Sequence, residues 1–292
     1  MDSSEARRRY AGQVRHKAGL RSERLIEALG TVAREDFLGP PPWRITRPPN
    51  LWNPELTSDL ARIYDDVVVA LDPARRLNNG LPSALTALIE ALELKEGQTV
   101  LHAGTGTGYY TALIAHCVGQ NGRVVGLELD PRLAARAREN LKRLPQVEIL
   151  CADATTYDAG KVDAILVNAG ASFPCPLWLD SLTPLGTLIL PLVRWPKGDR
   201  FGSGIAGIGA MFRIDGEEHG FAARFLSCFA VFPCVGALDE EADRVLAQVF
   251  DGGRLAEIRC LRRDAHEADS SCLLHGRGYC FSNADAKARP DK

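Results

Sequence analysis

The 292-residue chain lacks the features that would direct it to a membrane or to nucleic acid. Its apolar runs are too short and too often broken by glycine to span a bilayer. The N-terminal stretch MDSSEARRRY has no apolar segment of the kind found in signal peptides. The formal net charge is only −2, so no overall field attracts a polyanion. We therefore expect a cytoplasmic protein that binds neither membranes nor nucleic acid.

The eight cysteines also lack a familiar metal-binding pattern. No two of them form a CxxC pair, and no histidine joins them at the spacing typical of zinc ligands. Several lie in apolar runs such as SCFAVFPCVG. We expect reduced thiols that serve as small core residues, and no metal.

The N-terminal part of the chain shows a mixed pattern. Residues 3–38 have a helical pattern, with an apolar stripe at Leu25, Ile26 and Leu29 and a stop at Gly30. The proline-rich stretch 39–54 excludes a continuous helix or a central strand, so we predict an ordered loop. A strand is predicted next, over 64–72, and a helix over 83–94.

From residue 99 onward, short strands alternate with helices. This alternation predicts right-handed βαβ crossovers and a parallel sheet covered on both faces. The segments AMFRI and FAARFLSCFAVF predict an antiparallel hairpin that closes the sheet edge. Strands are predicted at 99–103, 123–129, 147–150, 162–169 and 186–192, and helices at 109–118, 131–144 and 176–182.

Three regions follow from these patterns. Residues 1–72 form an N-terminal helical and loop segment, and residues 73–235 form an α/β domain with a Rossmann-like sheet. Residues 236–292 form a C-terminal extension with a helix at 238–250, strands within 257–264 and 272–282, and a disordered tail.

The stretch LHAGTGTGYYTALIA at 101–115 places three glycines after a predicted strand. A phosphate-binding P-loop needs Lys and Ser or Thr after its last glycine, but Tyr109 and Tyr110 follow here. A dinucleotide fingerprint has the spacing GxGxxG, and this chain has GxGxG. The pairs VNAG and YDAGK resemble short-chain dehydrogenase motifs, but Tyr157 precedes the NAG instead of following it. None of these three motif readings fits.

The GxGxG spacing suits S-adenosylmethionine (SAM), which carries no phosphate. Glycines let the amino-acid end of SAM approach the backbone, and helix N–H groups can meet its carboxylate. Glu128, at the end of the second strand, can accept from both ribose hydroxyls. Asp153, after the third strand, can accept from the adenine amine, with Ala154 beside the ring. Glycines and acids at three successive strand ends therefore predict a SAM site.

On these motifs, the sequence resembles the protein-L-isoaspartate O-methyltransferases from about residue 10 to about residue 235. The stretches that carry the resemblance are RHKAGLRSERLIEALGTVAREDFLGP, VLHAGTGTGYYTALIA, GLELDPRLAARARENLKRL, VEILCADAT, and TLILPL with the hairpin after it. The resemblance implies a Rossmann-like SAM-dependent methyltransferase sheet, mostly parallel with an antiparallel C-terminal hairpin.

Two departures from the family stand out. His102 replaces the acidic residue that usually precedes the glycine loop. The family has Thr-Ile-Ser-x-Pro before the next helix, and its serine is regarded as an active-site residue. Here the matching stretch is NNGLPS, which places Gly80 at the serine position. The sequence therefore leaves open whether the chain repairs isoaspartate, whereas it predicts methyl transfer.

The expected reaction is methyl transfer from SAM to a carboxylate of a protein, peptide or small metabolite. A carboxylate is ionised at neutral pH and needs no base, and the sequence offers no clear base. Asn78 and Asn79 could orient it, although NNG is also turn-prone. The alternatives are an O- or N-methyltransferase for small molecules and a non-catalytic SAM-binding protein. The expected cofactor-binding residues are Ser83, His102, Gly104, Thr105, Gly106, Gly108, Glu128, Asp153, Ala154 and Asn168.

Overall fold

A computed structural model gives the fold of the chain as two compact units, Met1–Ala152 and Asp153–Lys292. This division by packing differs from the three regions expected from sequence, which stay a prediction. The structure describes residues 3–47, 50–194, 207–218, 220–232 and 234–284.

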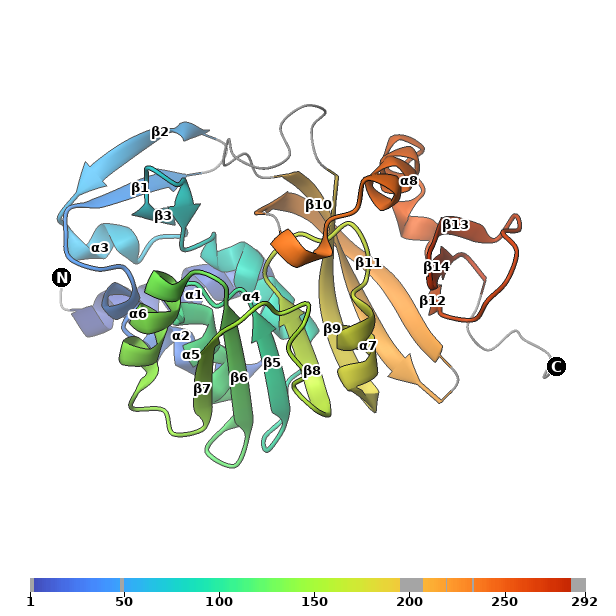
Figure 1. Cartoon of the computed structure of the whole chain (residues 1–292). Helices are drawn as coiled ribbons and strands as arrows, with labels where there is room; N and C mark the ends of the chain where they lie inside the picture. The colour runs from blue at the N-terminus through green and yellow to red at the C-terminus, as the bar shows by residue number, and fades with distance from the viewer. Residues whose placement is uncertain (1–2, 48–49, 195–206, 219, 233, 285–292) are drawn as a thin grey trace. The chain divides into compact units, whose positions relative to one another are not determined.

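The first unit opens with helices, as the apolar pattern predicts. They are α1 (Ser3–Ala18), α2 (Glu23–Thr31) and the short 3-10 helix η1 (Arg34–Phe37) (Figure 1). The Ser22 hydroxyl caps α2 by accepting from the Leu25 N–H at 3.3 Å. Gly30 lies inside α2, one residue before its end, so it does not stop the helix. No helix among the described residues is long and apolar enough to cross a membrane.

The proline-rich stretch contains strands, so its prediction as a loop was wrong. A four-stranded antiparallel sheet has the order β2-β1-β3-β4. Its inner strand β1 lies between two proline clusters and contains no proline, while Pro54 lies in the edge strand β2, where a missing N–H is tolerated. The strands are β1 (Trp43–Arg47), β2 (Asn50–Thr57), β3 (Val68–Asp72) and β4 (Leu77–Asn78), and the helix α3 (Leu60–Ile63) precedes β3.

Three parallel strands form the centre of the first unit. They are β5 (Thr99–Ala103), β6 (Arg123–Glu128) and β7 (Val147–Cys151), side by side in Figure 1 and close to their predicted bounds. The helices α4 (Pro82–Ala91), α5 (Tyr109–Val118) and α6 (Pro131–Leu141) alternate with them. Asp130 caps α6 by accepting from two backbone N–H groups, which explains its start at Pro131.

The second unit begins with a parallel pair and continues antiparallel. β8 (Val162–Val167) pairs in parallel with β9 (Leu182–Arg194), and α7 (Pro176–Ser181) connects them. β10 (Gly207–Glu217) and β11 (Gly220–Val231) form the predicted hairpin.

The hairpin does not close the sheet edge as expected, because β11 pairs with a further strand, β12. The order continues β12-β14-β13, so the C-terminal extension adds three antiparallel strands. The predicted tail falls mostly on 285–292, outside the described residues. The added elements are η2 (Val235–Ala237), α8 (Glu240–Asp251), η3 (Leu255–Glu257), β12 (Cys260–Arg262), β13 (Cys272–Gly276) and β14 (Tyr279–Ser282).

Candidate functional site

The glycine loop joins β5 to α5 and has a backbone that favours glycine. Gly104, Gly106 and Gly108 have φ values of +83°, +58° and +96°. These values lie in the left-handed region, which side chains other than glycine rarely adopt. The Gly104 N–H donates to the Leu127 carbonyl at 2.8 Å, which ties the loop to β6. A Cβ built on Gly106 would meet nothing within 4 Å, so space for a ligand lies beside it.

Glu128 is held against this loop by two backbone donors. The Gly106 N–H donates to Oε2 at 2.7 Å, and the Asp130 N–H donates to Oε1 at 3.0 Å. Burial raises the pKa of Glu128, while these two hydrogen bonds oppose the rise. Each carboxylate oxygen has a second lone pair, so the anchored side chain can still accept from a ligand.

The loop and Glu128 together fit the nucleoside end and the amino-acid end of SAM. The open space at Gly106 adjoins an anchored acceptor for a diol. No side chain in the described part of the chain caps α5, so its first N–H groups stay available to a carboxylate. The roles of these residues toward SAM stay predictions.

His102 is fully buried in β5. Its Nδ1 shares a hydrogen bond of 2.9 Å with the Thr111 hydroxyl of α5. Burial lowers the pKa of His102 to about 3, so the imidazole is neutral at physiological pH. The neutral ring and its bond to α5 favour a structural role over the expected contact with SAM.

Asn78, Asn79 and Gly80 form a turn that uses both amide carbonyls. The Asn78 Oδ1 accepts from the Gly80 N–H at 2.8 Å, and Gly80 has a φ of +75°. The Asn79 Oδ1 accepts from the Arg34 guanidinium at 3.2 Å. The turn is therefore compatible with hydrogen-bond donation to an acceptor carboxylate, because the Nδ2 donors take no part in these bonds.

Arg34 is a fully buried arginine that the sequence analysis did not identify. Besides Asn79, its guanidinium donates to the carbonyls of Ile63 at 2.6 Å and Val67 at 2.8 Å. It also lies 5.9 Å from the ring centroid of Tyr109 in α5. Arg34 thus links the asparagine turn to α5. No local pattern distinguished it from the chain's many exposed arginines.

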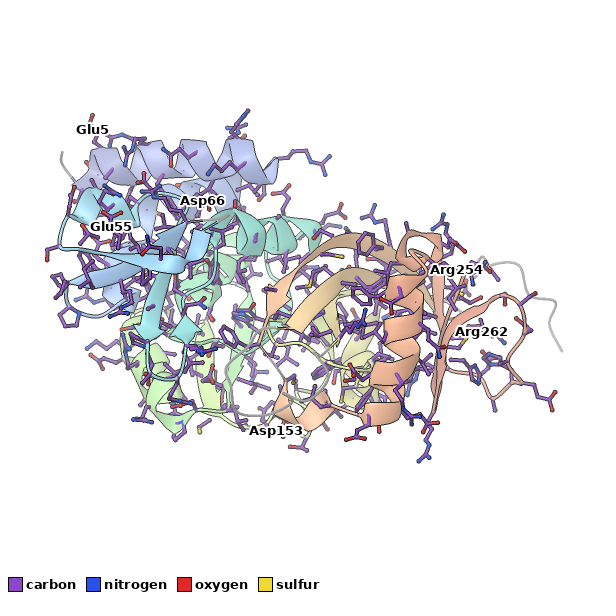
Figure 2. All side chains as sticks on the ribbon, turned by 90° about the horizontal axis from the view of Figure 1, so that it is seen from above. Glu5, Glu55, Asp66, Asp153, Arg254 and Arg262 are labelled. Atoms are coloured by element: carbon purple, nitrogen blue, oxygen red, sulfur yellow. The ribbon has the colours of Figure 1, made fainter. Side chains whose placement is uncertain are left out.

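Asp66 is a second buried charge that the sequence analysis missed. Its side chain, labelled in Figure 2, accepts from the N–H and the hydroxyl of Ser83 at 2.9 and 2.8 Å, at the start of α4. Lys17 of α1 pairs with it at 3.1 Å. Ser83, expected to bind the cofactor, thus binds Asp66 through its hydroxyl hydrogen, and its oxygen can still accept.

Three further predicted residues lie in the second unit and are described there by themselves. The Asp153 Oδ1 accepts from the N–H and hydroxyl of Thr155 at 2.8 and 2.7 Å. The Ala154 carbonyl accepts from the Trp178 indole at 2.8 Å. Asn168 follows β8 and is half-buried. Their roles toward adenine and cofactor stay predictions.

Gly236 of η2 packs against this part of the second unit, which the sequence did not indicate. A Cβ built there would lie 2.2 Å from the Thr155 hydroxyl and 2.8 Å from the Asp153 Oδ2. Any side chain at Gly236 would therefore displace Thr155 or the Asp153 carboxylate.

Sequence comparisons identify a family and relatives that this chain resembles. The model of the family "Protein-L-isoaspartate(D-aspartate) O-methyltransferase (PCMT)" matches residues 61–199. Protein-L-isoaspartate O-methyltransferase 2 of Archaeoglobus fulgidus is 32% identical over 203 residues, which cover 67% of this chain and 83% of the relative. The Ignicoccus hospitalis protein-L-isoaspartate O-methyltransferase is 30% identical over 192 residues, covering 64% of this chain and 84% of the relative.

Solved structures support the fold class. A protein-L-isoaspartate O-methyltransferase structure superposes with a TM-score of 0.62 at 22% identity, covering 84% of this chain and 69% of that one. A putative Plasmodium falciparum member, in complex with S-adenosyl-L-homocysteine, gives 0.59 at 18% identity, covering 78% and 97%. The expected Rossmann-like methyltransferase fold is confirmed, with a longer antiparallel part than the sequence predicted.

Proposed function

The chain belongs to the protein-L-isoaspartate(D-aspartate) O-methyltransferase family, and on that premise we propose that it methylates a carboxylate of a protein or peptide. It is a SAM-dependent methyltransferase. The observation that carries the proposal is the anchored carboxylate of Glu128 beside the open space at Gly106.

The glycine loop and Glu128 are the cofactor residues of the first unit. Gly104, Thr105, Gly106 and Gly108 border the amino-acid end, and Glu128 accepts from the ribose hydroxyls. Bound SAM supplies a methyl group already activated by the sulfonium. The chain's own residues therefore need only align the acceptor and exclude water.

The proposed acceptor is a carboxylate, because a hydroxyl or amine acceptor would need a base to remove its proton and His102 is a poor one. A carboxylate with a reference pKa near ~4 is ionised at neutral pH and needs no deprotonation. His102, whose pKa burial lowers to about 3, is too weak a base to serve a hydroxyl or amine acceptor.

The Nδ2 groups of Asn78 and Asn79 orient the acceptor carboxylate in this proposal. Their carbonyls are engaged by Gly80 and Arg34, which fixes the direction of each amide. Two amide donors thus precede Gly80, which occupies the position of the family's serine. The acceptor is therefore bound by N–H donors rather than by a serine.

Labelled SAM tests the reaction. The enzyme is incubated with peptides carrying aspartyl, isoaspartyl, glutamyl or C-terminal carboxylates, and with matched peptides whose carboxylates are amidated. We expect label in a carboxylate peptide, released as methanol by mild base, and none in the amidated partner. Base-stable label would contradict carboxylate transfer.

Asparagine variants test the orientation of the acceptor. Asn78→Ala and Asn79→Ala should each lower kcat/KM roughly ten-fold, because each removes one hydrogen bond to a charged group. Affinity for S-adenosylhomocysteine should stay unchanged, and Asn53→Ala on the edge strand β2 is the matched control. Unaltered kcat/KM in both variants would exclude this role.

A further inference from the structure

Four metal-ligating side chains gather in the C-terminal extension. One ligand atom from each of His266, Cys272, His275 and Cys280 lies within 4.8 Å of all the others. His266 lies in the segment between β12 and β13, while His275 and Cys280 face each other across the β13–β14 ladder. This cluster lies outside residues 61–199, which match the family, and outside the proposed methyltransferase site.

The spacing within the cluster approaches that of a tetrahedral site. The Cys272 Sγ lies 3.5 Å from the His266 Nε2. Typical zinc–sulfur and zinc–nitrogen bonds at the tetrahedral angle separate the two ligand atoms by about 3.6 Å. The two imidazole rings meet edge to face with centroids 4.8 Å apart, so both reach the same point without stacking. Small shifts of the remaining side chains complete the tetrahedron.

The histidines are prepared to act as ligands. The His266 Nδ1–H donates to the Asp264 carbonyl at 2.9 Å, which leaves a lone pair on the Nε2 that faces Cys272. Metal-bound histidines are typically oriented by a second hydrogen bond of this kind. The His275 Nδ1 is buried and has no hydrogen-bond partner in the described part of the chain. A buried, unpaired nitrogen is costly unless something binds it.

A backbone donor lies beside the Cys272 sulfur. The Asp269 N–H donates to the Cys272 Sγ at 3.4 Å, although the Asp269 carboxylate also lies 3.5 Å from that sulfur. Arg262, at the end of β12 (Figure 2), pairs with Asp264 at 2.9 Å. Two thiolates and two neutral imidazoles would balance the charge of one divalent cation.

We propose that His266, Cys272, His275 and Cys280 bind one Zn²⁺ in a closed structural site. Both thiols release their protons to solvent on binding, and no redox change occurs. Four protein ligands leave no open position for a substrate, so the ion has no catalytic part. It instead fastens the irregular segment 263–271 to the β13–β14 hairpin.

The site also explains why the sequence pattern was missed. The ligand order is His-x5-Cys-x2-His-x4-Cys, which contains no CxxC pair. The expectation of no metal rested on the missing pair and on finding no histidine at zinc-ligand spacing, although Cys272 and His275 are separated by two residues. Pairing of β13 with β14 brings Cys280 opposite His275, and this contact is invisible in the spacing.

Metal analysis of the full-length protein tests the proposal. The protein is purified without chelators or nickel resin, and its zinc content is measured by plasma mass spectrometry. We expect about one zinc per chain, and a Co²⁺-substituted sample should show the visible absorption of tetrahedral thiolate coordination. The double variant Cys272→Ser/Cys280→Ser should lose the zinc, while Cys228→Ser, at an exposed cysteine of β11, should retain it.

Thiol protection in the wild-type protein covers the case in which the variant fails to fold. After chelation, Cys272 and Cys280 should react with an alkylating reagent, and added Zn²⁺ should protect these two thiols alone. The melting temperature should fall on chelation and recover with zinc. Zinc-free wild-type protein that gains no protection from added Zn²⁺ would overturn the proposal, as would a Cys272–Cys280 disulfide or zinc retained by the folded double variant.

Discussion

Single residues in the glycine loop determine where a ligand can approach. Gly106 leaves open space, whereas a Cβ on Gly108 would lie 2.7 Å from the Leu141 side chain of α6. The two glycines therefore serve different purposes. Gly106 admits a ligand, and Gly108 allows α5 and α6 to pack closely. The sequence pattern treats these glycines alike, so it could not separate the two roles.

The burial of His102 should make the free energy of unfolding depend on pH. Its pKa is about 3 in the folded chain against a usual value of 6.5. Below pH 6.5 the unfolded chain takes up a proton that the folded chain refuses, so stability falls as pH falls towards 3. Between pH 6.5 and 5 this loss amounts to about 2 kcal/mol.

Urea unfolding at both pH values measures this contribution. His102→Gln, which can keep a hydrogen bond to Thr111, should lose correspondingly less stability on acidification. His16→Gln, at an exposed position on α1, should behave as wild type. Equal losses in all three proteins would show that His102 does not titrate in this way.

At the scale of elements, the asparagine turn explains the missing family serine. Gly80 combines a left-handed backbone with a close neighbour, because its Cβ would lie 3.3 Å from the Leu85 side chain of α4. The turn is held by Asn78 and by the contact of Asn79 with Arg34. A serine therefore cannot be restored here without strain.

The Gly80→Ser variant tests this conclusion. It should lose about 1–2 kcal/mol of unfolding free energy for the left-handed backbone alone, and gain no isoaspartyl methylation. Gly97→Ser is the matched control, because Gly97 has a φ of +82° but nothing within 4 Å of its Cβ position. The extra loss in Gly80→Ser measures the contact with Leu85. A stable variant with new isoaspartyl activity would contradict the account.

Helices and strands with a clear apolar pattern were predicted correctly, whereas the strands of the proline-rich stretch were not. The strands β5 and β6 and the helix α5 lie close to their predicted bounds, because short apolar runs are bounded there by glycines such as Gly108 and Gly119. The prediction of a loop over 39–54 was wrong because it considered the total proline content of the stretch and not the position of each proline. The prolines flank β1 or lie on an edge strand, so they do not prevent pairing.

At the scale of the whole molecule, the sequence indicates candidate cofactor residues, whose roles stay predictions, but not the residues that support them. Glu128 was identifiable because it ends a predicted strand beside the glycine loop. Arg34 and Asp66 were not, because their partners come from segments distant in the chain. The extension escaped prediction for the same reason: strand pairing brings its four metal-ligating residues together.

Calorimetric titration with S-adenosylhomocysteine tests the central claim most directly. The wild-type chain should bind it, with its ribose hydroxyls donating to Glu128, and should not bind NADH, because the GxGxG loop lacks the GxGxxG spacing of a dinucleotide site. Glu128→Ala should weaken binding roughly ten- to a hundred-fold, as expected for a lost hydrogen bond to a charged group. Glu148→Ala on β7, exposed and paired with Arg123, should leave affinity unchanged. Equal affinity of Glu128→Ala and wild type, or tight binding of NADH, would contradict the account.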